Sequence, residues 1–190
     1  ADTGGSSSWA WLADEGTYGP RWNFTRNTSS GEYLHSPCSD GEGNTVMAWQ
    51  GVTCSAPPAV CSNQTPSCVV TALDLSLYNL RGALASSMSQ LGHLRALDLS
   101  SNGLHDPIPT SIGAMTDLSV LDLSVNQFSG RIPLSLFNLT RITLLSLHRN
   151  MLSGPLASTV GRLSQLQQLY LNDNVLTGPL PPELGALSAL

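Results

Sequence analysis

The feature that most constrains this chain is a repeat with a period of 24 residues and no insertion. Each period starts with an apolar residue, at Val70, Leu94, Leu118, Ile142, Leu166 and Leu190. Within the five complete periods, the fourth and sixth residues are always Leu, and the eleventh is Leu or Phe. Composition alone does not place five consecutive periods in one register, so residues 70–190 are an array of like structural units.

Each period is called a coil here, numbered 1 to 5 from Val70, and its residues are counted from its first apolar residue. The L-x-L segment predicts a short strand with alternate side chains pointing inward. One coil cannot bury its own apolar edge, so neighbouring coils stack and share a core, with the strands in a parallel sheet on the inner, concave side.

The ninth residue of four coils is Asn, and coil 1 has Tyr78 there. An inward amide must have its hydrogen bonds satisfied, and a ladder of Asn side chains can bond the backbone of its own and adjacent coils. We therefore predict a structural role for these residues: Asn102, Asn126, Asn150 and Asn174.

The second half of each coil contains a G-x-[I/L]-P pattern, seen best in Gly130–Pro133 and Gly178–Pro181. Glycine permits a turn after the Asn, and proline prevents a regular helix from starting there. The apolar residues that follow are expected to close the core from the convex side.

The whole pattern resembles the plant-type leucine-rich repeat, L-x-x-L-x-L-x-x-N-x-L-x-G-x-I-P-x-x-L-G-x-L-x-x. The resemblance covers 70–190 and implies an α/β-type repeat solenoid, a right-handed coil with short 3-10 or irregular segments on its convex side. We expect an N-terminal cap over 1–69 and five repeats over 70–190. The array stops at the first residue of a sixth coil, so we expect the natural protein to continue or a partner to cover that end.

All four cysteines lie in the non-repeating segment, at Cys38, Cys54, Cys61 and Cys68. An even, clustered count suggests two disulfides in an oxidising compartment, and the absence of any C-x-x-C pair argues against zinc. The residues alone leave three pairings open.

Two further segments of the cap carry resemblances. Trp49-Gln-Gly-Val-Thr-Cys54, with Pro37-Cys38 upstream, resembles the PC…W-x-G-V-x-C cap of the same repeat proteins. That resemblance implies a disulfide between Cys38 and Cys54, which leaves Cys61 for Cys68. The segment Gly16–Trp22 resembles the cap start of leucine-rich-repeat proteins from algae and other protists.

Four N-x-S/T sequons beside the clustered cysteines favour an extracellular protein, secreted or at the cell surface, and predict glycosylation at Asn23, Asn27, Asn63 and Asn138. The formal net charge of −5 and the absence of Lys argue against nucleic acid and against anionic membranes as partners. No apolar run approaches the length of a bilayer span.

Side chains at positions 3, 5, 7 and 8 of each coil are expected to be exposed on the concave sheet. Coils 1 to 3 have mostly small residues and Asp there, whereas coils 4 and 5 differ. Aromatic and Arg side chains are the usual anchors of interfaces. The predicted ligand-binding residues are therefore His148, Arg149, Tyr170 and Asp173. The alternative is an ordinary solvated sheet face.

Asp74, Asp98 and Asp122 share position 5, and such a stack could attract calcium. The resemblance argues against this, because Asp is a solvated strand residue at that position in the family. We therefore predict neither a metal nor a cofactor.

The sequence contains no G-x-S-x-G, P-loop, H-E-x-x-H or Rossmann motif, and the repeat supplies no oxyanion hole, so we predict no catalytic residues. Three functions remain open. The first is recognition of a protein, peptide or glycan ligand. The second is a structural or adhesive glycoprotein of a cell surface, wall or extracellular filament that self-associates. The third is a secreted enzyme inhibitor.

Overall fold

The computed structural model describes residues 51–55 and 69–190 of the 190-residue chain. The described residues belong to two compact units, one holding 51–55 and 69–74 and the other holding 75–190. Within these ranges, none of the helices has the length and apolarity that crossing a bilayer requires.

The smaller unit contains an antiparallel pair of strands, β1 (Val52–Cys54) and β2 (Val70–Asp74), with Val52 opposite Leu73. The ends of the pair are tied by backbone bonds from Asp74 N–H to the Gly51 carbonyl, 2.7 Å, and from Ser55 N–H to the Val69 carbonyl, 2.9 Å. The V-x-C part of the cap motif therefore forms a strand, and the first L-x-L segment begins in its partner.

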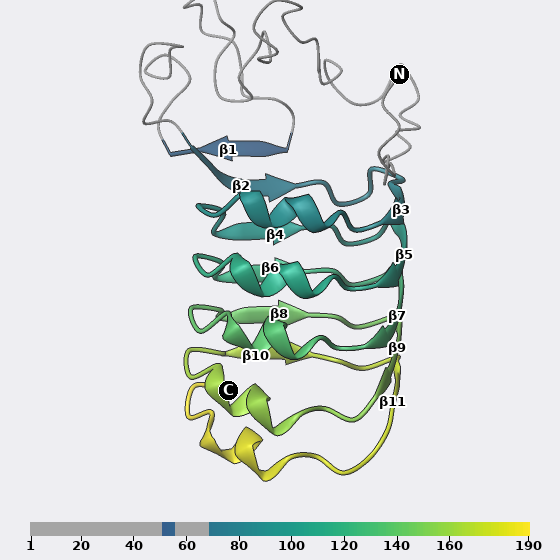
Figure 1. Cartoon of the computed structure of the whole chain (residues 1–190), viewed down its shortest axis with the longest axis vertical. Coiled ribbons are helices and arrows are strands. Elements are labelled where there is room, and N and C mark those ends of the chain that lie inside the picture. Colours follow the sequence, from purple (N-terminus) through teal and green to yellow (C-terminus); the bar gives the residue numbers. More distant parts are fainter. Residues whose placement is uncertain (1–50, 56–68) are drawn as a thin grey trace, which may run out of the picture. The chain divides into compact units, whose positions relative to one another are not determined.

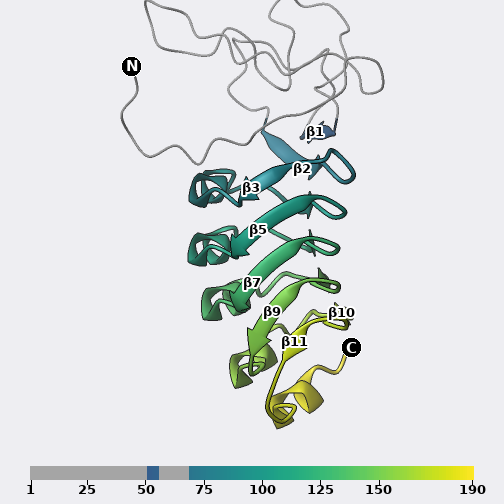
Figure 2. The same ribbon diagram turned by 90° about the vertical axis from the view of Figure 1, so that its right-hand side faces the viewer.

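In the larger unit every coil has three sides, and equivalent sides stack on one another (Figures 1 and 2). One side is a parallel sheet, the main sheet, with the strand order β4 (Ala96–Asp98), β6 (Val120–Asp122), β8 (Leu144–Ser146) and β10 (Gln168–Tyr170). Each residue pairs with the residue 24 positions later, as Leu97 does with Leu121 and Asp98 with Asp122. The sequence period is thus the sheet register, and the predicted leucine-rich-repeat solenoid is confirmed.

The opposite side consists of short 3-10 helices, as expected for the convex segments. They are η1 (Ser86–Gln90), η2 (Thr110–Ala114), η3 (Leu134–Asn138), η4 (Ser158–Arg162) and η5 (Pro182–Ala186). Each follows an extended residue, which is Pro before η2, η3 and η5. Each helix is closed by a backbone hydrogen bond in which the residue after the helix donates to the carbonyl three residues earlier. An example is the bond from Met115 N–H to the Ile112 carbonyl, 3.1 Å.

The third side differs from the expectation of a simple turn, because it is a second parallel sheet. Its strands are β3 (Arg81–Ala83), β5 (Gly103–Pro107), β7 (Gln127–Arg131), β9 (Met151–Gly154) and β11 (Val175–Leu176), in that order along the array. These segments lack apolar alternation. They pair because the fixed period brings the same backbone stretch of each coil beside that of the next, whatever the side chains.

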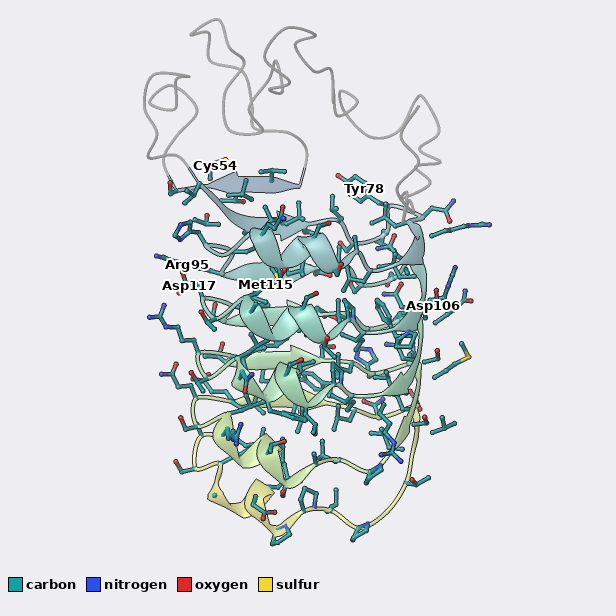
Figure 3. The ribbon with its side chains drawn as sticks, in the orientation of Figure 1. Cys54, Tyr78, Arg95, Asp106, Met115 and Asp117 are labelled. Atoms are coloured by element: carbon teal, nitrogen blue, oxygen red, sulfur yellow. The ribbon has the colours of Figure 1, made fainter. Side chains whose placement is uncertain are left out.

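The core runs through the middle of the stacked coils. In coil 2 the residues at positions 4, 6 and 11, Leu97, Leu99 and Leu104, are completely buried, and Met115 closes them in from the helix side (Figure 3). Burying one such side chain contributes roughly 1.5–3 kcal/mol, so the repeated leucines supply much of the stability of each coil.

Where a coil leaves the main sheet, its eighth residue has a left-handed backbone. The five residues at this position have φ between 52° and 64°: Leu77, Ser101, Val125, Arg149 and Asp173. All five coils are also left-handed at position 13, where four of them have Gly and coil 2 has Asp106, with φ of 68°. The left-handed residue at position 8 turns the chain from the main sheet toward the second sheet.

Candidate functional site

The exposed face of the main sheet is held from beneath by the asparagine ladder. The Asn126 side-chain nitrogen donates to the carbonyl of Leu123 in its own coil, 3.2 Å, and to that of Leu99 in the preceding coil, 2.9 Å. The Asn126 Oδ1 accepts the backbone N–H of Leu104, 3.0 Å, also in the preceding coil. Each such amide therefore links the exit from one strand to the exit from the strand before it.

The same bonds recur at the other three positions. Asn102, Asn150 and Asn174 each donate to carbonyls of their own and the preceding coil and accept one backbone N–H from that preceding coil. Because the bonds are the same, the backbone at positions 7 and 8 is presented in the same way by every one of these coils. What varies along the face is the side chain.

Two of the predicted ligand-binding residues form an exposed ion pair at position 8 of coils 4 and 5. Arg149 Nε lies 3.5 Å from Asp173 Oδ2, and the same carboxylate oxygen accepts a hydrogen bond from Asn172 Nδ2, 3.0 Å. The two side chains are 67% and 59% exposed, so solvent screens their attraction. The pair leaves most of the donor capacity of the guanidinium free.

The other two residues make an aromatic contact between coils 4 and 5. The rings of His148 and Tyr170 are 6.2 Å apart at 69°, an edge-to-face arrangement. Tyr170 is 45% exposed, and its hydroxyl donates to Gln168 Oε1, 3.2 Å. The structure thus gathers His148, Arg149, Tyr170 and Asp173, called the face cluster below, on adjacent coils.

Two positions expected to be exposed on this face are in fact buried, Ser124 at 3% and Ser146 at 2%. Ser146 lies between Asp122 and Tyr170 in the sheet register, and its hydroxyl is 3.0 Å from His148 Nδ1. Because an external substrate cannot reach that hydroxyl, the Ser146–His148 contact orients the imidazole rather than activating a nucleophile.

On the face of coils 2 and 3, the carboxylates bond to their own backbone. Asp98 Oδ1 accepts the backbone N–H of Ser100, and Asp122 Oδ1 that of Ser124, both at 2.9 Å. One oxygen of each carboxylate therefore caps the turn that follows its own strand. Within residues 51–55 and 69–190, no three His, Cys, Asp or Glu side chains are grouped in a way that could hold a metal ion.

A charge ladder that the sequence reasoning missed runs along another edge of the array. Asp117 Oδ1 is 2.6 Å from Arg141 Nη1, and its Oδ2 is 3.7 Å from His93 Nδ1. All three residues directly precede the first apolar residue of a coil, which is the signal that could have revealed them. Figure 3 shows Asp117 on the side of the array opposite Asp106.

Most of the predicted modification sites lie outside the described residues. These are Asn23, Asn27, Asn63, Cys38, Cys61 and Cys68. Cys54 at the end of β1 is disulfide-bonded, and the choice of its partner stays a prediction. Asn138 ends η3 and is exposed, as is Thr140 of its sequon, so both groups needed for glycosylation are accessible.

The similarity to a known protein family lies in the repeats. The family model described as Leucine Rich Repeat matches residues 93–115, 117–139 and 165–187. Among curated proteins, none matches this chain.

Several solved structures are similar. The leucine-rich-repeat ectodomain of the receptor kinase SOBIR1 from Arabidopsis thaliana is 31% identical, with a TM-score of 0.66, over 74% of this chain and 77% of that one. A chain of the BIR3–SERK2 complex from Arabidopsis thaliana is 29% identical, with a TM-score of 0.67, over 86% of this chain and 76% of that one.

A larger structure is similar over only part of its length. The PEPR1–AtPEP1 structure is 34% identical, with a TM-score of 0.70, over 87% of this chain and 20% of that one. This chain therefore spans about a fifth of the length of that chain.

Proposed function

Because this chain belongs to the leucine-rich-repeat family, we propose that it is a non-catalytic extracellular recognition module that binds a protein or peptide ligand. The proposed contact surface is the main-sheet face of coils 4 and 5. Ectodomains of plant receptors are among the similar structures, and this supports a location outside the cell or at its surface.

The observation that carries the proposal is the face cluster itself. Tyr and Arg are the side chains most often found at energetic centres of interfaces, because they combine a large contact area with directed polar groups. Here Tyr170 and Arg149 are exposed on adjacent coils, whereas coils 2 and 3 have Ser101, Asp122 and other short side chains at the equivalent positions.

The chemistry of the cluster indicates what kind of ligand fits. An exposed Arg–Asp pair contributes little to folding stability, so a ligand carboxylate can compete for Arg149 at small cost. The ring of Tyr170 beside it offers apolar contact, and the edge-to-face ring of His148 limits its motion. A peptide with an acidic residue next to an apolar one matches this arrangement.

Similar structures support a polypeptide ligand. PEPR1 is found together with AtPEP1, and a chain similar over most of this sequence comes from the BIR3–SERK2 complex.

The proposal is tested by selecting binders from a displayed library of random peptides on the whole chain. We expect the selected peptides to be rich in acidic and apolar residues. The double variant Arg149→Ala/Tyr170→Ala should bind them about a hundredfold more weakly, which corresponds to losing roughly 2.7 kcal/mol at an interface centre.

A matched control uses the same two positions one pair of coils earlier, where Ser101→Ala/Asp122→Asn keeps the oxygen that caps Ser124. This control should bind the selected peptides within about twofold of the wild type. Full affinity in the Arg149→Ala/Tyr170→Ala variant would remove the face cluster from the binding surface.

Self-association is the rival that this experiment must separate from ligand binding. Sedimentation of the chain over a range of concentrations should give a monomer, and the face-cluster variant should sediment identically. A concentration-dependent oligomer that the double variant abolishes would show that the face binds copies of the chain instead of a peptide.

A further inference from the structure

A second candidate binding site lies on coils 1 to 3, where the main sheet turns toward the second sheet. A groove of about 660 Å³ is lined there by side chains from positions 8, 10 and 12 of successive coils, including Leu77, Asn79, Arg81, Ser101, His105 and Gln127. Its size falls in the range typical of sites for small ligands. Figure 3 shows Asp106, the neighbour of His105, on this edge of the array.

The groove exists because coil 2 lacks a side chain at position 10. Coils 1, 3, 4 and 5 have Asn79, Gln127, Met151 and Val175 there, and coil 2 has Gly103. Gly103 is not among the left-handed glycines, so its backbone does not require glycine. The missing side chain leaves room between Asn79 and Gln127, and the stem of Arg81 takes part of it: a Cβ at residue 103 would stand 3.3 Å from Arg81 Cγ and 3.3 Å from the Leu80 carbonyl oxygen.

Three of the polar side chains around this hollow have no polar partner among the described residues. Among the residues that the structure describes, none forms an ion pair with the exposed Arg81 guanidinium or a hydrogen bond with the side-chain amides of Asn79 and Gln127. His105 Nδ1 is 3.2 Å from Asp106 Oδ2, and the His105 side chain is 51% exposed. The Arg81 guanidinium, which has no ion-pair partner among the described residues, can therefore receive an anion, whereas the His105 imidazole already lies beside the Asp106 carboxylate.

The backbone at the groove, in contrast, is already used. Gly103 N–H donates to the Leu80 carbonyl, 2.7 Å, and Leu80 N–H donates to Asn102 Oδ1, 2.9 Å. Ser101 N–H is bound to the Ser124 carbonyl, 3.0 Å. With these groups committed, a peptide lying over Gly103 finds no free backbone donor in Leu80, Ser101 or Gly103, and Leu77 is the one apolar side chain among the described residues of the lining.

We infer that this groove binds a short acidic oligosaccharide. The Arg81 guanidinium holds a uronate carboxylate. The amides of Asn79 and Gln127 and the hydroxyl of Ser101 bond sugar hydroxyls, which both donate and accept hydrogen bonds as the amides do. Leu77, 67% exposed, covers an apolar face of a sugar ring at the rim. The site lies on coils 1 to 3 and is separate from the face cluster of coils 4 and 5.

The experiment is a titration of the isotope-labelled whole chain with trigalacturonate, followed by amide NMR shifts. We expect the shifts to centre on residues 101–105. Both Gly103→Gln, which fills the hollow with the side chain found in coil 3, and Arg81→Gln, which removes the cation, should raise Kd at least about tenfold. The fully methyl-esterified trisaccharide, which has the same hydroxyls without carboxylates, should bind correspondingly more weakly.

Met151→Gln is the matched control, because it places the same side chain at position 10 of coil 4 and should leave Kd unchanged. Arg131→Gln is the control for Arg81→Gln, because it removes a positive charge elsewhere on the second sheet and should also leave Kd unchanged. Thermal melting identifies a variant that fails to fold, and Arg81→Gln at an exposed position keeps the test valid if Gly103→Gln does not fold.

Three results would overturn the assignment: trigalacturonate shifts that do not involve residues 101–105, equal affinity for the esterified sugar, or a Kd unaffected by both groove variants. A glutamate oligopeptide that shifts the same amides at lower concentration than the sugar would also overturn it, in favour of an acidic peptide. Peptide binding at the face cluster is read out independently, because Arg149→Ala/Tyr170→Ala should leave the sugar titration unchanged.

Discussion

Coils 2 and 3 and coils 4 and 5 share one interior pattern and differ on the outside, although Leu169 and Leu171 of coil 5 are half-buried where their counterparts are buried. Their leucines at positions 4 and 6 and their Asn at position 9 occupy the same places and make the same backbone bonds. On the exposed face, coils 2 and 3 have short side chains and carboxylates that cap their own turns. Coils 4 and 5 have a ring pair and an ion pair facing solvent instead.

The difference separates what folds the chain from what the chain can recognise. The repeated interior fixes a regular backbone, and every coil then displays its face residues from equivalent positions. A substitution on the face therefore changes the surface chemistry without changing the scaffold, and a substitution in the interior does the reverse. The following predictions test this separation.

The largest effect is expected for the ladder. Asn126→Leu leaves the Leu104 N–H without its partner and removes one of the two amide donors from each of the Leu99 and Leu123 carbonyls, and we expect a loss of about 4 kcal/mol in the free energy of unfolding. Asn174→Leu removes equivalent bonds in coil 5, whose neighbouring Asn172 is exposed, so water can replace part of them and the loss should be about half as large. Urea unfolding measures both, and equal losses would show that the position along the array does not matter.

A comparable contrast is expected on the helix side, between two glycines that share the sequence context Gly-Ala. A Cβ on Gly113 would lie 2.2 Å from the Ser135 carbonyl oxygen in the next coil, whereas a Cβ on Gly185 would meet nothing within 4 Å. Gly113→Ala should therefore cost about 3 kcal/mol, because backbone in η3 must move. Gly185→Ala should cost nothing or stabilise by about 0.5 kcal/mol. If the melting temperatures of both variants fall together, the spacing of η2 and η3 is not as tight as the structure has it.

The smallest effect concerns the left-handed position 8. Val125 is β-branched and has φ of 53°, a conformation that Asn adopts far more readily. Val125→Asn should stabilise the chain by about 1 kcal/mol, with its N–H still bonded to the His148 carbonyl. Ser101→Asn, at the same position of coil 2, should gain less than about half of that. A loss of stability in Val125→Asn would mean that side-chain packing outweighs backbone strain there.

Much of the fold could be predicted because the residues that recur in each 24-residue period are the ones that face the core. The L-x-L segments, the inward Asn and the apolar residues of the 3-10 helices each occupy a constant place in the 24-residue period, and each faces the core. The choice of the four face-cluster residues rested on residue type alone. That Arg149 meets Asp173 and His148 meets Tyr170 depends on register and rotamer, which the sequence does not display.

The second sheet and the groove escaped prediction for a different reason. Segments such as Ser129-Gly130-Arg131 are strands only because a neighbouring coil supplies backbone partners, so no pattern of their own marks them. The groove depends on what residue 103 lacks. A missing side chain becomes visible only once the five coils are superimposed in space.

The ladder bonds have one further consequence, for how such a chain can change in length. Every side-chain bond of Asn126 reaches either its own coil or the one directly before it, never further. Duplicating or deleting a whole period therefore reproduces the same bonds at a new junction, while an insertion of one or two residues inside a coil breaks them. The chain can be lengthened or shortened in steps of one coil, and each added coil brings a fresh set of face positions on which a new specificity can arise.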